Sequence, residues 1–186
     1  MTRRLMLGLA LTLLAGCATT SERFLWEEYT SVGIASIGAG QYRQAEQFLN
    51  RALVKADGLG AKEQGISLNG LGELYRRQHR LEDAKRMFTR ALLVKEAGLG
   101  PDHPDVAITL TNLGLVYLAE RRDAEAAPLL ERALAIQQSK LSKKSAAVGR
   151  TLTALAEVYR HLGREAEAGP LEERARSIRE QEGADR

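Results

Sequence analysis

The stretch that decides the fold of this chain is Leu71-Gly72-Glu73-Leu74-Tyr75. It recurs as Leu113-Gly114-Leu115-Val116-Tyr117 and again as Leu155-Ala156-Glu157-Val158-Tyr159, each copy 42 residues after the one before. Other residues follow the same interval, since Arg90-Ala91-Leu92 recurs 42 residues later as Arg132-Ala133-Leu134. A weaker copy, Arg51-Ala52-Leu53, lies 39 residues earlier. Self-similarity at a fixed interval of this length indicates a solenoid, a stack of repeated structural units.

Each repeat contains two amphipathic helical patterns. In the third repeat, apolar residues recur at steps of three and four in two runs, namely Ile108, Leu110, Leu113, Val116 and Tyr117, then Ala126, Leu130, Ala133 and Leu134. A polar turn at residues 120–123 separates the two runs, and glycine and proline at residues 98–104 mark the junction between repeats. The sequence therefore predicts an all-α chain of helix-turn-helix units.

One position of each helix carries a small residue. The first-helix position holds Gly33, Gly72, Gly114 and Ala156, and the second-helix position holds Ala45, Ala84, Ala126 and Ala168. Glycine inside a helix costs roughly 1 kcal/mol relative to alanine. Its repetition at one position therefore predicts that the two helices of a unit approach closely there.

These residues resemble the tetratricopeptide repeat (TPR). Its core pattern is Leu-Gly-x-x-Tyr, then Ala, an apolar residue four later, which is Leu49, Phe88 or Leu130 here, and Ala three after that. The 42-residue interval, the junction at residues 99–107, and Pro128 and Pro170 inside the second helices are similar to the kinesin-light-chain variety. The resemblance implies a right-handed α-solenoid of about four units, at about residues 26–57, 65–97, 107–139 and 149–182.

The last repeat departs from this pattern. Glu172 occupies the slot that is apolar in the other units, and residues 172–180 are charged on most faces. A terminal repeat with a polar outer face is typical of the cap of a solenoid. We therefore expect the array to end with this helix.

The N-terminus is typical of an export signal. Arg3 and Arg4 precede an uncharged run, residues 5–14, which is shorter than the roughly 20 residues of a membrane-spanning helix. The following Leu14-Ala15-Gly16-Cys17 resembles a bacterial lipobox, which implies cleavage before Cys17 and attachment of acyl chains to it. A plain signal peptide with an incidental cysteine is the alternative, and a twin-arginine export motif is less favoured because the charged segment is very short.

We expect residues 1–16 to be the signal peptide, residues 17–25 to be the lipidated cysteine and a short tether, and residues 26–186 to be the array. Several acyl chains hold a protein firmly at a membrane. The residue after Cys17 is Ala18 rather than Asp, which by the lipoprotein resemblance implies the outer membrane, facing the periplasm.

Composition and motifs argue against nucleic-acid binding and catalysis. The formal net charge is +3, and removal of Arg3 and Arg4 leaves 25 basic against 24 acidic residues, which is no footprint for nucleic acid. None of the three histidines has a second metal ligand at a useful spacing, and no nucleophile or phosphate-binding motif occurs. We therefore expect no enzyme activity, no metal, no cofactor and no small-molecule substrate.

The resemblance also implies that the first helices line a concave, partner-binding face. The implied groove residues are Asn69, Glu73 and Arg76 in the second unit, Thr111, Asn112, Leu115 and Leu118 in the third, and Thr153, Glu157 and Arg160 in the fourth. The amide of Asn112 can both donate and accept hydrogen bonds, which suits the backbone of a bound peptide. The alternative is that the Glu–Arg pairs are ordinary surface ion pairs and the leucines pack on the next unit.

The resulting functional hypothesis is a membrane-anchored adapter of the bacterial envelope that binds a protein or peptide in the periplasm or at the membrane. A structural protein that assembles through its terminal helices is the alternative. An enzyme with an unrecognised site is a more remote one.

Overall fold

The computed structural model describes residues 2–140 and 145–184, and the side chains of residues 20–140 and 145–181. In these ranges the secondary structure is entirely helical. The helices are α1 (Thr2–Gly38), α2 (Tyr42–Ala56), α3 (Ala61–Arg77), α4 (Leu81–Leu99), α5 (Pro104–Ala119), α6 (Asp123–Lys140), α7 (Ala146–His161) and α8 (Glu165–Ala184). The all-α prediction is confirmed.

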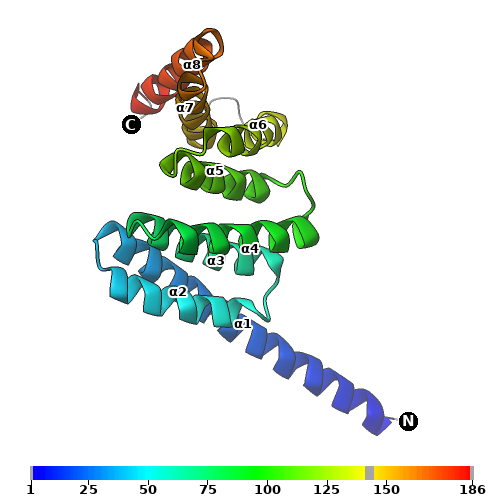
Figure 1. Cartoon of the computed structure of the whole chain (residues 1–186). Coiled ribbons are helices and arrows are strands. Elements are labelled where there is room, and N and C mark those ends of the chain that lie inside the picture. The colour runs from blue at the N-terminus through cyan, green and yellow to red at the C-terminus, as the bar shows by residue number, and fades with distance from the viewer. Residues whose placement is uncertain (1, 141–144, 185–186) are drawn as a thin grey trace.

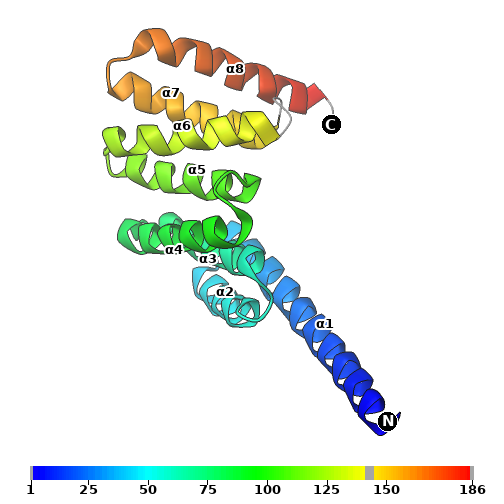
Figure 2. The same ribbon diagram turned by 90° about the vertical axis from the view of Figure 1, so that its right-hand side faces the viewer.

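The helices form four antiparallel pairs that stack in chain order (Figure 1). The first helix of each later pair packs against the second helix of the pair before it, and first helices of successive pairs also touch. The N-terminal part of α1 projects away from the stack in both views (Figure 2). The molecule is therefore a solenoid in which each pair meets only its neighbours.

The repeated glycines bring the two helices of a unit together, as the sequence predicts. A Cβ atom on Gly72 would lie 2.5 Å from the ring of Phe88, and one on Gly33 or Gly114 would lie 2.7 Å from Leu49 or Leu130. Leu49, Phe88 and Leu130 are fully buried. Because these glycines on α1, α3 and α5 have no side chain, the large residue of the paired helix fills the space beside them.

Each turn between the paired helices has one residue with a left-handed backbone. Gly40, His79, Arg121 and Gly163 have φ angles of 72°, 60°, 59° and 74°. The next residue is arginine in three of the four turns. The guanidinium carbon of this arginine lies over the ring of the tyrosine near the end of the preceding first helix. The distance to the ring centroid is 4.2 Å for Arg80 over Tyr75 and 3.8 Å for Arg164 over Tyr159. We call this arrangement the arginine–tyrosine clasp. It gives each of these three turns a cation–π contact.

Buried polar contacts link neighbouring units. The Thr111 and Thr151 hydroxyls lie 2.9 Å apart between α5 and α7. The indole N–H of Trp26 donates to the Ser67 hydroxyl at 2.9 Å between α1 and α3. A buried polar group costs free energy unless it is hydrogen-bonded, so these pairs favour one register of stacking.

The N-terminal helix contains the segment with the export-signal pattern. α1 is a single helix through residues 17–25, the predicted tether, although the Cys17 side chain lies outside the described side chains. Among the described residues, none of the helices combines the length and the apolar character needed to cross a membrane. The cleavage site and the lipid anchor stay predictions.

Candidate partner-binding grooves

The first candidate site is a groove of about 450 Å³ on the first helices of the N-terminal half. Four isoleucines form its apolar walls, and predicted site residues lie between them. We call it the isoleucine groove and define it by Ile34 and Ile37 of α1, Ile66, Asn69 and Glu73 of α3, and Ile108 and Asn112 of α5. Ile34 is 52% exposed, although burial of a large apolar side chain away from water is favourable. The groove therefore offers an apolar contact surface to a partner.

A buried polar network forms the floor of the isoleucine groove. The Lys95 ammonium donates to the Thr109 hydroxyl at 3.1 Å and to the Asp105 backbone carbonyl at 3.2 Å, and the Asn69 amide donates to the Thr109 hydroxyl at 3.0 Å. Burial disfavours the charged form of Lys95 and lowers its pKa to about 8, while the charge of Asp105 acts in the opposite direction. One carboxylate oxygen of Asp105, Oδ2, is buried without a hydrogen-bond partner among the described atoms.

Glu73 is one of two carboxylate residues that line this groove, the other being Asp105. Burial by itself would raise its pKa, but the side chains of Arg76 and Arg77, which both donate to its carboxylate at 2.8 Å, hold the pKa below its ordinary value. Glu73 is therefore ionised and paired at neutral pH. The contact between Glu73 and Arg76 is an ion pair between neighbouring turns of one helix, as expected if these residues form an ordinary surface pair.

The structure separates the predicted residues of the third unit into two sets. The Asn112 amide lies in the isoleucine groove and makes no side-chain hydrogen bond within the described part of the chain. Thr111 and Leu118 are buried against the fourth unit, at 3% and 8% exposure. Leu115 is half-buried and packs on the same cluster. Only Asn112 and part of Leu115 thus remain for a partner.

The predicted residues of the fourth unit lie in a second groove between α7 and α8, which we call the end groove. Two adjoining hollows of about 450 and 240 Å³ form it, and both are lined by Thr153, Glu157 and Arg179. Its apolar floor consists of Leu115, Ala146, Gly149, Ala154, Ala175 and Ile178. Its polar rim consists of Arg150, Thr153, Glu157, Arg160, Glu172, Arg176 and Arg179.

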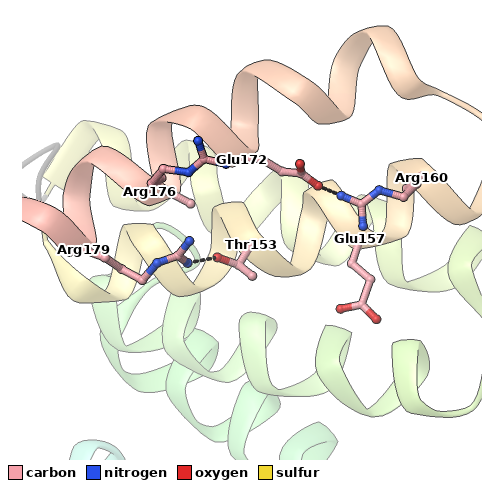
Figure 3. A pocket seen from close by; sticks show the side chains of 7 residues that line it. Thr153, Glu157, Arg160, Glu172, Arg176 and Arg179 are labelled. Carbon is pink, nitrogen blue, oxygen red and sulfur yellow. Dashed lines mark hydrogen bonds and ion pairs between the residues drawn. The ribbon is translucent and has the colours of Figure 1, made fainter.

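Figure 3 shows how the polar side chains of the end groove lie. Arg160 is ion-paired with Glu172, and Arg179 donates to the Thr153 hydroxyl at 3.1 Å. The Glu157 carboxylate points away from the Arg160–Glu172 pair (Figure 3). Glu172, which occupies the slot of a buried leucine or phenylalanine elsewhere, is thus held by a cation at the surface.

Sequence reasoning missed the isoleucine walls and the contribution of α8. Ile66 and Ile108 are 42 residues apart, so the repeat itself marks them as equivalent positions. Ile34 and Ile37 carry no such mark, because the equivalent residues 39 positions later, Glu73 and Arg76, are charged. Among the described residues, no group of histidine, cysteine, aspartate and glutamate side chains could hold a metal ion.

Comparison with known families identifies the repeat. A family model described as the tetratricopeptide repeat matches residues 63–139 and 122–181. Among curated proteins, no relative matches the chain.

Solved structures share this fold at low sequence identity. Nearly identical TPR-like repeats of a kinesin light chain from Podospora anserina are 21% identical to this chain, with a TM-score of 0.64 over 86% of this chain and 76% of that one. BtubC (BKLC) from P. vanneervenii is 20% identical, with a TM-score of 0.58 over 89% and 91% of the two chains. PilF from Pseudomonas aeruginosa is 16% identical, with a TM-score of 0.50 over 85% and 78%. At these identities the likeness concerns the fold alone.

Proposed function

The chain belongs to the tetratricopeptide repeat family. We propose that it is an adapter that binds a partner protein or peptide in the isoleucine groove. We further propose that it is anchored to a membrane of the bacterial cell envelope. The observation that carries the proposal is the groove itself, which is lined by an exposed isoleucine, Ile34, by two partly exposed ones, Ile66 and Ile108, and by the Asn112 amide, which has no side-chain partner among the described residues. Sites of this kind combine apolar contact area with a few polar groups that fix orientation.

The chemistry of the groove favours a short peptide with apolar side chains. Ile34, Ile66 and Ile108 come from three successive first helices, so a segment that crosses them contacts each helix in turn. Burial of such surface stabilises a complex by roughly 25 cal/mol per Å² removed from water, before the costs of association. The Asn112 amide can bind one peptide group of that segment through both its donor and its acceptor.

The proposed location follows from the sequence of the N-terminus. Acyl chains on Cys17 would hold the array close to a membrane, because the first residue of the predicted array follows only nine residues after the start of the predicted tether. The signal and Ala18 favour the outer membrane, with the array in the periplasm. We propose no catalytic role for the chain.

We expect a photo-crosslinking amino acid at position 112 to capture one discrete partner in living cells, because this side chain lines the isoleucine groove. The matched control is position 135, an exposed alanine on α6, outside the residues that line either groove. Adducts are read on denaturing gels and identified by mass spectrometry. Equal adducts from both positions, or none from position 112, would contradict the proposed use of this groove.

We expect Cys17→Ser to abolish incorporation of an alkyne-labelled fatty acid and to leave the predicted signal peptide uncleaved, which raises the apparent mass on a denaturing gel. The reason is that the thiol is the proposed site of acylation, and no other cysteine is present in the sequence. Density-gradient separation of the membranes of wild-type cells tests the outer-membrane assignment. A serine variant that stays labelled would show that the anchor is not at Cys17.

A further inference from the structure

The outer surface of the last unit has the shape of a stacking surface but different chemistry. In the third unit, Leu115, Leu118 and Leu134 pack on the fourth unit, and Leu118 and Leu134 are less than a tenth exposed. The residues 42 positions later are Glu157, Arg160 and Arg176. The positions that bind the next unit in the middle of the array are therefore charged at its end.

The end groove nevertheless keeps an apolar floor. Its larger hollow has Leu115, Ala154 and Ile178 along its base and a volume of about 450 Å³. The small residues Ala146 and Gly149 also line this hollow. A terminal repeat whose only role was to present a polar face to solvent would not need this apolar hollow.

The charge around this hollow is mostly positive and mostly unpaired. Within the described part of the chain, Arg150 and Arg176 make no ion pair or side-chain hydrogen bond, and Arg179 bonds only to the neutral Thr153. Glu172 is neutralised by Arg160. Counted over the described residues, three arginines without a carboxylate partner thus surround the groove, against one unpaired carboxylate, that of Glu157.

We propose that the end groove binds an acidic amphipathic helix of a partner protein, placed where the first helix of a further unit would stack. The shape favours a helix because α3, α5 and α7 each pack on the equivalent surface of the preceding pair. The charge favours Asp and Glu beside the apolar stripe of that helix, since guanidinium groups bind carboxylates in a two-point geometry. This site is separate from the isoleucine groove and does not depend on how that groove is used.

The probe is a fluorescent peptide with the sequence of α7, residues 146–161, in which Ala147→Glu and Thr151→Glu are introduced. The array already stacks α7 on the equivalent surface of the third unit, where Thr151 faces Thr111 of α5. The residue 42 positions after Thr111 is Thr153, the partner of Arg179, so a carboxylate at peptide position 151 faces the arginine rim, and position 147 lies one turn earlier on the same helix face. The peptide with the unchanged α7 sequence is the matched control. Fluorescence anisotropy with the purified full-length protein measures both affinities at low and at high salt.

We expect the acidic peptide to bind at least about tenfold more tightly than the unchanged peptide, and to weaken at high salt as exposed charges are screened. Arg176→Glu with Arg179→Glu should weaken it at least about tenfold, because like charges then oppose one another. Both arginines are exposed, so the variant should fold, which circular dichroism checks. Arg43→Glu with Arg90→Glu, on α2 and α4, makes the same change in net charge outside the end groove and should leave binding unchanged.

Three results would overturn the proposal: no binding of the acidic peptide, equal binding of both peptides, or equal loss in both double variants. Dimerisation of the protein in light scattering without peptide binding would assign the end groove to a second copy and would also overturn it. The crosslink at position 112 reports on the isoleucine groove alone. The two proposals can therefore fail separately.

Discussion

Phe88→Ala should lower the free energy of unfolding by about 3–5 kcal/mol, the usual range for removal of a fully buried phenylalanine. The ring has no exposed surface and fills the space left by Gly72, between α3 and α4. It also packs with Leu113 and Val116 of α5, so its loss opens a cavity between the second and third units. In a stack where each unit is stabilised by its neighbours, such a cavity weakens the array at its centre.

Urea denaturation followed by circular dichroism measures this effect. Phe88→Leu is the matched control, because leucine occupies the same slot at Leu49 and Leu130. It should cost less than about 1.5 kcal/mol. If alanine and leucine at position 88 were equally destabilising, Phe88 would not act by filling the interface.

Lys95→Met should raise the free energy of unfolding at pH 7 by about 1–3 kcal/mol. This is the free-energy cost of burying the charge, which the substitution removes, minus the contribution of the hydrogen bonds that it also removes. Lys95 is 1% exposed, and methionine has a similar length without the charge. The acceptors keep other donors, since the Thr109 hydroxyl accepts from Asn69 and itself donates to the Asp105 carbonyl. The substitution therefore leaves no new buried acceptor unpaired among the described atoms.

The advantage of the methionine variant should disappear as the pH rises. The pKa of Lys95 is about 8 in the folded protein and 10.5 without burial. Between these values the unfolded chain binds more protons than the folded one, so the free energy of unfolding of the wild type rises with pH. Below the folded-state pKa both states are protonated, and the penalty is fully present.

Thermal or urea unfolding of both proteins from about pH 7 to about pH 10 measures the difference between them across the window in which Lys95 titrates. Burial and Glu46 raise the pKa of Tyr75, but that group is common to both proteins and cancels in the comparison. A difference that stayed constant over this range would show that Lys95 does not titrate with a lowered pKa. A methionine variant less stable than the wild type at neutral pH would show that its hydrogen bonds outweigh the cost of burial.

The helices and their pairing could be predicted from the sequence, because they follow from local periodicity and from the 42-residue interval. Gly72 and Phe88 illustrate this, since a costly glycine and a bulky residue recur at matching positions along the chain. The clasp between Arg80 and Tyr75 is equally regular in the sequence. It went unpredicted because the attraction between a guanidinium and a ring depends on where the turn places them.

The candidate site was harder to predict because it depends on what covers each position. Thr111 and Asn112 are adjacent in the sequence, yet one is buried against Thr151 and the other lies in the isoleucine groove. The spacing of residues along one helix cannot distinguish these outcomes, since they depend on how far the next pair is rotated. Arg176 and Arg179 follow the charged pattern of a cap, and that pattern does not show the hollow that both residues line.

The strictly sequential packing of the helices has a kinetic consequence. Among the described residues, no helix touches one more than two elements away along the chain. The contacts that form during folding therefore close only short loops, which favours rapid folding. Folding can begin at any pair and spread in both directions, so this chain should acquire structure progressively while its C-terminal residues are still being synthesised.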